Sequence, residues 1–383
     1  MKYAIINTTI VMPDHLIPGG TIVIEDDIIV DFGKGKKICT EGMEVIDAKG
    51  AYTGPGLIDI HTHADGVVNF HEDPARAAKT LLNHGVTSVL PTLYFNVPAD
   101  ELIRQANVIR TTRDAGEADN IIGLYMEAPY MNPKFGANRE NNPWKDDITK
   151  ERFAKLVDET SDMVRVWCVA PERANILEFV KYAKAKNPSV VFSVAHSEAE
   201  PTDIEPLMPY GLKCATHHTN ATGTLYKYPE CRTACVDETA LYNDTIYTEL
   251  ICDKIGIHVQ PYLLRLVKKI KGDDKLILIS DSFVEYGPIP DGELYEGADD
   301  INFDFAGEIC GTKFQLDAAC HNMMVHTGAS MSQVFKYASL NPATMLGLQN
   351  ELGSIGIGKK ANLITVDHEF NIQSVYLNGN KVR

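Results

Sequence analysis

The stretch Pro55-Gly56-Leu57-Ile58-Asp59-Ile60-His61-Thr62-His63 is an apolar run that ends in two histidines. A short apolar run next to a proline and a glycine is typical of a buried β-strand. Alternate residues of a strand point to the same side, so we expect His61 and His63 to face inward together. The stretch therefore predicts a buried strand that carries reactive side chains at its carboxyl end.

Seven similar apolar runs follow along the chain: Val86–Pro91, Ile121–Glu127, Val164–Val169, Val190–His196, Leu212–His217, Ile246–Cys252 and Leu276–Asp281. Between the runs lie stretches with helical periodicity, among them Ala99–Thr112, Thr149–Ser161, Glu172–Lys186 and His258–Lys271. Strands that alternate with helices predict βαβ units and a parallel sheet. Eight such units predict an α/β fold, a (β/α)₈ TIM barrel. A doubly wound open sheet is the structural alternative.

The two ends of the chain differ from the middle, because both consist of short β-rich segments and turns. These segments include Thr21–Ile24, Ile28–Phe32, Asn362–Val366 and Ser374–Leu377, followed by the hairpin signal Asn378-Gly379. Neither end is long enough to form a stable sheet alone. We therefore predict a small β-sandwich domain formed from both termini (residues 1–53 plus 351–383), with the barrel inserted at 54–350. The acidic, Gly- and Pro-containing stretch Ser282–Glu308 is expected to form a loop over the active-site face.

Composition limits the partners of this 383-residue chain. Its formal net charge is −16, so it should repel nucleic acids and anionic membranes. No apolar run is long enough for a membrane span. A phosphorylated small substrate would need a local cationic pocket. The eight cysteines are scattered and the first residues lack the apolar core of a signal peptide, which together predict free thiols and a cytoplasmic location.

Five of the eight predicted strands end in a potential metal ligand. These residues are His61 with His63, Glu127, His196, His217 and Asp281. Strand ends of a (β/α)₈ barrel converge on one face, where catalysis takes place. Imidazoles and carboxylates bind a divalent metal such as zinc, iron, manganese or cobalt, which would polarise a carbonyl and activate water. Asp281 is the candidate proton shuttle, although taken alone it could also be a helix N-cap.

The segments around these residues resemble the amidohydrolase superfamily, and within it the N-acetylglucosamine-6-phosphate deacetylases. The segments are Pro55–His63, Gly123–Tyr130, Ala195–Ser197, Thr216–Ala221 and Leu278–Asp281, together with a C-terminal Asn341-Pro342-Ala343 signature. The resemblance extends over nearly the whole chain. It implies hydrolysis of the N-acetyl group of an amino sugar, N-acetylglucosamine-6-phosphate or a close relative, to the amine and acetate. It also implies a homodimer.

The resemblance also implies a ligand set of one or two divalent metals. Glu127, His196 and His217 would hold one metal, and His61, His63 and Asp281 would hold a second together with Glu127. Many two-metal amidohydrolases bridge the metals with a carboxylated lysine after the fourth strand. Here that strand is followed by Ala170-Pro171-Glu172, so Glu127 would be the bridge instead.

The remaining site residues follow from the resemblance alone. It implies that Ala137, Asn220 and Ala221 contact the sugar phosphate, and that His258 acts in catalysis as an oxyanion donor to the substrate carbonyl. Arg232 is the candidate phosphate ligand, or else a solvated loop charge. The sequence departs from the family where Asn138 replaces a histidine and Ala128 a glycine. The alternative substrate is a non-phosphorylated amino sugar or an N-acyl amino acid. If the protein is not an enzyme, the alternative is a non-catalytic barrel that binds sugars.

Overall fold

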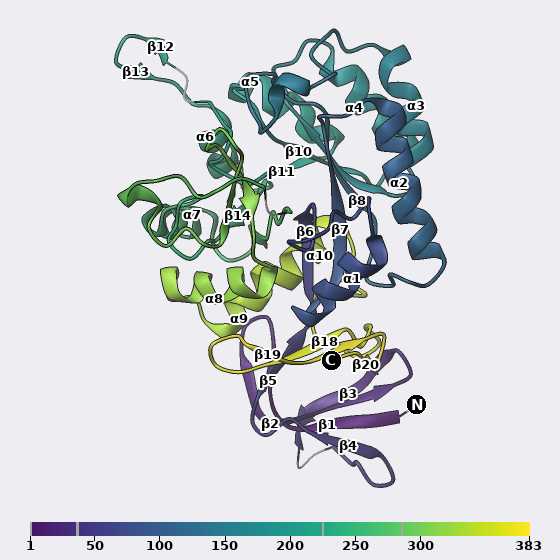
Figure 1. Ribbon diagram of the computed structural model, residues 1–383. Helices are drawn as coiled ribbons and strands as arrows, with labels where there is room; N and C mark the ends of the chain where they lie inside the picture. Colours follow the sequence, from purple (N-terminus) through teal and green to yellow (C-terminus); the bar gives the residue numbers. More distant parts are fainter. Residues whose placement is uncertain (1, 36–37, 224–225, 285) are drawn as a thin grey trace.

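The computed structural model describes residues 2–35, 38–223, 226–284 and 286–383. Eight parallel strands form a nearly closed barrel in the order β15-β14-β11-β10-β9-β8-β7-β6 (Figure 1). The strands are β6 (Leu57–Thr62), β7 (Val86–Tyr94), β8 (Leu124–Tyr130), β9 (Val164–Val169), β10 (Val191–Val194), β11 (Leu212–Ala215), β14 (Tyr247–Ile251) and β15 (Leu276–Ile279). Each of the eight predicted runs contributes one of them, which confirms the (β/α)₈ fold.

The first and last barrel strands meet through their carboxyl ends. The main-chain N–H of Asp281 donates to the carbonyl of His61 at 2.9 Å. The hydroxyl of Ser280 donates to the buried carboxyl group of Asp59 at 2.6 Å. These contacts bring the residue that follows β15 beside the histidines that end β6.

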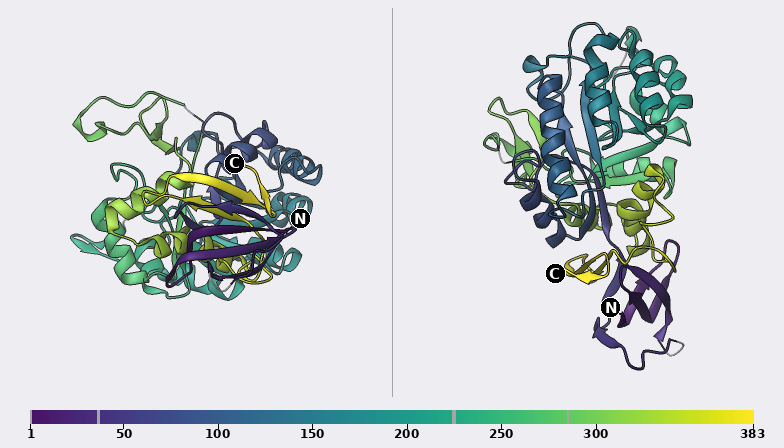
Figure 2. Two further views of the ribbon diagram at one scale, coloured as in Figure 1. Left: turned by 90° about the horizontal axis from the view of Figure 1, so that it is seen from below. Right: turned by 90° about the vertical axis from the view of Figure 1, so that its right-hand side faces the viewer.

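Helices pack around the barrel (Figures 1 and 2). They are α1 (Pro74–Asn83), α2 (Ala99–Asp114), α3 (Lys150–Thr160), α4 (Ile176–Lys186), α5 (Pro201–Ile204), α6 (Val236–Tyr242), α7 (Pro261–Lys271), α8 (Leu316–Thr327), α9 (Met331–Phe335) and α10 (Asn341–Leu346). Short 3-10 or π turns are η2 (Arg139–Asn141), η3 (Glu205–Tyr210), η4 (Glu293–Tyr295) and η5 (Lys336–Leu340). Helix α3 shows why they form: Phe153, Leu156, Val157 and Thr160 make one buried stripe with helical spacing.

The chain termini form a second sheet below the barrel (Figures 1 and 2). Its strands are β1 (Lys2–Val11), β2 (Leu16–Glu25), β3 (Ile28–Lys34), β4 (Glu44–Asp47), β5 (Tyr52–Pro55), β18 (Leu363–Val366), β19 (Ile372–Leu377) and β20 (Asn380–Lys381). The rings of Tyr3 and Tyr376 stack at 6.2 Å although two strands separate β1 from β19. The predicted β-domain is thus one continuous sheet folded onto itself. The exact domain limits at 53/54 and 350/351 stay a prediction.

Two local features shape the terminal sheet and its junction with the barrel. Asn378 and Gly379 both have positive φ (48° and 74°), which is the backbone of the predicted tight hairpin between β19 and β20. At the junction of β5 and β6, a Cβ on Gly56 would collide with the side chain of Thr87, so only glycine allows the two backbones to approach this closely.

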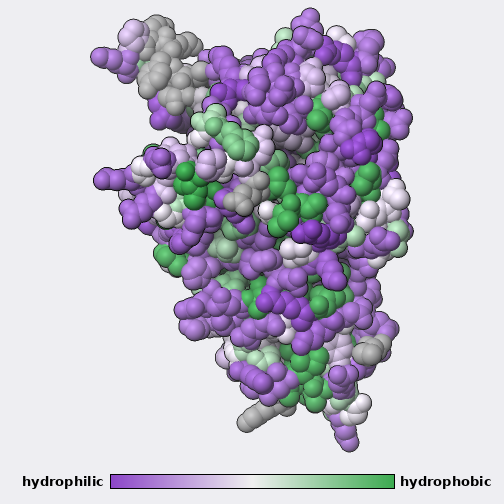
Figure 3. All heavy atoms as spheres, viewed as in Figure 1, coloured by the Kyte–Doolittle hydropathy of each residue, from purple (hydrophilic) through white to green (hydrophobic). Residues whose placement is uncertain are grey.

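The predicted loop Ser282–Glu308 is more structured than expected. It contains η4 and β16 (Ile301–Phe303), which pairs with β17 (Ile309–Thr312). The remaining short strands, β12 (Tyr226–Tyr228) and β13 (Cys231–Arg232), form a hairpin that projects from the barrel (Figure 1). The face seen in Figure 3 is mostly hydrophilic, with hydrophobic residues in small scattered groups. Among the described residues, no helix has the length and apolar character needed to cross a membrane.

Candidate active site

Six potential metal ligands meet at the carboxyl ends of the barrel strands, and all are buried: His61, His63, Glu127, His196, His217 and Asp281. His196, His217 and Asp281 each lie two residues beyond the end of a barrel strand and have positive φ values of 44°, 29° and 48°. This left-handed backbone is uncommon for residues other than glycine and is concentrated at functional sites. It turns each of the three side chains into the barrel mouth.

Glu127 lies between the two pairs of histidines and contacts each pair with a different oxygen. Its Oε1 lies 2.6 Å from His196 Nε2 and 3.1 Å from His217 Nε2. Its Oε2 lies 3.3 Å from His63 Nε2 and 3.6 Å from His61 Nε2. We call Glu127, His196 and His217 the His196 group, and His61, His63 and Glu127 the His61 group. Glu127 is therefore placed as a carboxylate bridge. The sequence predicted that Glu127 ends its strand, but it lies inside β8, which continues to Tyr130.

Asp281 completes the cluster from the far side. Its Oδ1 lies 3.5 Å from His61 Nε2 and 3.4 Å from His63 Nε2. Burial alone would raise the pKa of Asp281, but these two imidazoles outweigh it and hold the pKa below its usual range. Burial likewise opposes ionisation of Glu127, and His196 and His217 keep its pKa well below the usual value. Both carboxylates are thus kept ionised, which is the form that binds a cation.

The chemistry of this cluster fits a divalent metal. The donor set combines two carboxylates with four imidazoles, and two buried negative charges call for a compensating cation. Within the part of the chain that the structure describes, the buried Nε2 of His61 has no hydrogen-bond partner. It lies opposite Glu127 and Asp281, in the position of a ligand. The Glu127 carboxylate belongs to both groups, because each of its oxygens faces a different pair of histidines.

Glu249 belongs to the site although the sequence did not single it out. It is fully buried in β14, and its Oε2 lies 3.1 Å from His61 Nδ1. A carboxylate can only accept, so Nδ1 carries the proton and Nε2 of His61 is left available to bind a metal. Tyr125 Oη donates to the other oxygen at 2.9 Å, and the main-chain N–H of His217 donates to Oε2 at 3.3 Å. A lone acid within the apolar run Ile246–Cys252 was the signal available in the sequence.

His258 lies on the wall of the cavity above this cluster. Its Nδ1 is 3.3 Å from Asp253 Oδ2, and its buried Nε2 has no hydrogen-bond partner among the described residues. Because Asp253 can only accept, Nδ1 holds a proton. His258 Nε2 can donate to a substrate oxygen when it carries a hydrogen.

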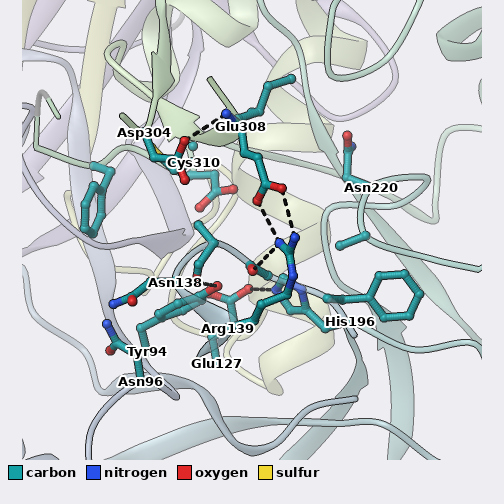
Figure 4. Close-up of a pocket in the computed structure, with 18 of the residues that line it drawn as sticks. Tyr94, Asn96, Glu127, Asn138, Arg139, His196, Asn220, Asp304, Glu308 and Cys310 are labelled. Carbon is teal, nitrogen blue, oxygen red and sulfur yellow. Dashed lines mark hydrogen bonds and ion pairs between the residues drawn. The ribbon is translucent and has the colours of Figure 1, made fainter. Parts of the chain in front are cut away.

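The cluster opens into a cavity of about 730 Å³ (Figure 4). Its walls include the predicted substrate residues Ala137, Asn220, Ala221 and His258, so the structure brings these four together. Arg232 is not among the described residues that line the cavity. It lies on β13, is exposed, and pairs with Glu238.

The sequence profile of the amidohydrolase family matches residues 53–382. The chain belongs to this family. A Haemophilus influenzae protein named N-acetylglucosamine-6-phosphate deacetylase is 27% identical over 99% of both chains. An Escherichia coli O157:H7 protein named N-acetylgalactosamine-6-phosphate deacetylase is 26% identical over 85% of this chain and 86% of its own. The crystal structure of the Pasteurella multocida N-acetylglucosamine-6-phosphate deacetylase superposes with a TM-score of 0.86 at 26% identity, covering 100% of this chain and 99% of that one.

The comparisons confirm the predicted family, the barrel with its terminal β-domain, and the hydrolase class. Amidohydrolases typically depend on a divalent metal, and the His61 and His196 groups are the candidate sites for it here. The roles of the individual residues stay predictions.

Proposed function

We propose that this protein hydrolyses the N-acetyl group of an amino sugar phosphate, N-acetylglucosamine-6-phosphate or a close relative, to the free amine and acetate. Water adds to the acetyl carbonyl, the C–N bond breaks, and the proton lost by water goes to the leaving amine. A bound divalent metal supplies Lewis acidity at the carbonyl and makes water more acidic. The residues of the barrel bind and orient the substrate and carry the proton from water to the amine.

Asp281 is proposed as the residue that carries the proton. Its carboxylate lies 3.5 and 3.4 Å from His61 and His63 and lines the cavity, which places it where it can take a proton from water. The protonated carboxyl group then donates to the amine as it leaves. His258 Nε2, aimed into the same cavity, is proposed to donate to the acetyl oxygen as negative charge develops there.

The bridging position of Glu127 is the observation that supports this proposal most directly. One carboxylate contacts His196 and His217 with Oε1, and His61 and His63 with Oε2. In a barrel that only binds sugars, nothing would require the ends of three strands to direct four histidines at one buried carboxylate. The non-catalytic alternative therefore has no support in the geometry.

A substrate panel tests the proposal. The metal-loaded protein is mixed with N-acetylglucosamine-6-phosphate, N-acetylgalactosamine-6-phosphate, N-acetylglucosamine and an N-acetyl amino acid, and acetate release is measured. We expect the fastest turnover with one of the two sugar phosphates. The non-phosphorylated sugar is the second candidate substrate, because the outer cavity wall carries the acids Asp304 and Glu308. Release of acetate from the amino acid alone would contradict the proposal.

Three finer predictions accompany it. The metal is proposed to be zinc, iron, manganese or cobalt, with one or two ions per chain, which elemental analysis of the purified protein would establish. The protein is proposed to form a homodimer, measurable by light scattering after size-exclusion chromatography. It is proposed to act in the cytoplasm, which cell fractionation would test.

A further inference from the structure

The segment that follows β8 places two cations on the cavity wall. Lys134 and Arg139 are the Lys and Arg side chains among the described lining residues, and both were overlooked in the sequence. Each is paired with a carboxylate: Lys134 Nζ lies 2.5 Å from Glu198, and Arg139 contacts Glu308. The cavity thus has positive charge that is already neutralised by the protein itself.

The pair between Arg139 and Glu308 is bidentate (Figure 4). Two nitrogens of the guanidinium donate to the two carboxylate oxygens at 2.7 and 2.9 Å. This planar fork also matches two oxygens of a phosphate. The side chains are 40% and 48% exposed, so the pair is an exposed ion pair that exchanges with little loss of stability.

A close-packed segment connects Arg139 to the metal cluster. Arg139 also donates to the carbonyl of Gly136 at 3.3 Å, and Tyr94 Oη donates to the carbonyl of Ala137 at 3.1 Å. A Cβ on Gly136 would lie only 2.6 Å from Tyr94 Oη, which shows how tightly the segment packs. The Tyr94 ring in turn meets His63 edge-on at 5.7 Å. The Tyr94 side chain therefore contacts both this segment and His63 at the proposed site of hydrolysis.

We propose that Arg139 binds the phosphate group of the amino sugar, exchanging the Glu308 carboxylate for two phosphate oxygens. The inference rests on the proposed function and names the residue that selects a phosphorylated substrate. Glu308 lies at the end of the loop between β16 and β17 and is half exposed, so its carboxylate can turn into water when the phosphate enters. No covalent bond changes in this exchange.

The competing arrangement keeps the ion pair intact. In that case Glu308, with Asp304 and Glu140 on the same wall, would accept hydrogen bonds from the hydroxyls of an uncharged sugar. A phosphate would then be repelled and not bound. The two arrangements make opposite predictions about which sugar binds more tightly, and this contrast defines the experiment.

Isothermal titration of the metal-loaded protein with glucosamine 6-phosphate and with glucosamine separates them without depending on turnover. We expect Arg139→Gln to weaken binding of the phosphorylated sugar by about 10- to 100-fold, because a charge-assisted bidentate contact is lost. Binding of glucosamine should change by less than about two-fold. Arg139→Lys keeps the charge without the fork and should fall in between. Glu308→Gln should strengthen phosphate binding by up to about five-fold, since it removes a competing carboxylate.

Arg104→Gln is the matched control, because its guanidinium forms a similar fork with Glu101 at 2.7 and 2.6 Å outside the cavity. It should bind both sugars like the wild type. Three results would overturn the proposal: equal affinity of the wild type for both sugars, an unchanged phosphate preference in Arg139→Gln, or loss of that preference in Arg232→Gln instead. Absence of acetate release from every N-acetyl sugar would count against the proposed function, while the titrations would still report on Arg139.

Discussion

Replacing Glu249 with glutamine should weaken metal binding by the His61 group more than by the His196 group. The Glu249 carboxylate is fully buried and accepts from His61 Nδ1 at 3.1 Å, which orients Nε2 towards Glu127 and Asp281. Glutamine keeps the size and one acceptor oxygen but removes the charge. If its NH₂ group faces the His61 ring, the contact with Nδ1 is lost. If it faces the Tyr125 hydroxyl, that hydroxyl accepts instead of donating and can itself donate to Thr216. In both orientations the bond from His61 Nδ1 to a charged acceptor is lost.

The size of the effect follows from the kind of bond that is removed. A buried hydrogen bond to a charged group contributes about 1.5–3 kcal/mol, which corresponds to roughly 10- to 150-fold in affinity. Loss of partners behind a metal ligand typically costs about 10- to 100-fold. The contact of Glu249 with the His196 group is the longer 3.3 Å bond from the main-chain N–H of His217, so that group should lose less affinity.

The assay is a titration of metal-free protein with zinc in competition with a chelator, fitted to two sites, with circular dichroism to verify folding. Tyr125→Phe is the control, because it removes the hydroxyl donor but leaves the carboxylate on His61. We expect it to change zinc affinity by less than about ten-fold, as for an ordinary hydrogen bond. An equal loss at both groups, or unchanged affinity in Glu249→Gln, would refute the proposed orienting role.

Three other changes test other parts of the molecule. Asp281→Asn should lower turnover by about 10²- to 10⁴-fold, as expected for loss of a general acid–base, while elemental analysis still finds the metal of the His196 group, to which Asp281 does not belong; turnover close to the wild type would contradict its role as proton carrier. Gly56→Ala should destabilise the protein by about 1–3 kcal/mol in chemical denaturation, because the added Cβ collides with Thr87. Burial lowers the pKa of Lys271 from 10.5 to about 8, so the folded protein binds this proton less tightly than the unfolded chain does. The wild type should therefore gain stability relative to Lys271→Met between pH 8 and 10.5, measured by urea unfolding at both limits, and parallel curves would exclude this contribution.

The barrel was predictable because each strand is a short, mostly apolar run and is separated from the next by a helix. Val164–Val169 coincides with β9 for this reason. The limits of β8 were less predictable, because backbone pairing and not hydrophobicity sets them. Pro129 and Tyr130 continue the ladder with β9 beyond the predicted end, whereas Ile121 forms only an isolated bridge with Val89.

The site was predictable where the fold class alone places a residue. Any side chain that ends a barrel strand points to the same face, which is why His196 and His217 could be assigned without coordinates. Glu249 lies within its strand, and only the register between β14 and its neighbours turns it towards His61. Arg139 lies in the loop after β8, and the path of this loop depends on the packing of Gly136 and Ala137 against Tyr94. No sequence pattern indicates that contact.

The net charge of −16 is consequently a weak guide to what this cavity binds. Exposed charges further apart than about 8 Å are largely screened at physiological ionic strength, so the surface as a whole acts little on a bound phosphate. Phosphate binding depends instead on the Arg139 guanidinium on the cavity wall and on the Glu308 carboxylate that is paired with it. Arg139 held by Glu308 is neutral in sum yet can bind an anion, because an exposed ion pair costs at most about 1 kcal/mol to separate. An acidic protein can in this way bind an acidic substrate, provided that the positive charge is local and its own counter-charge can move aside.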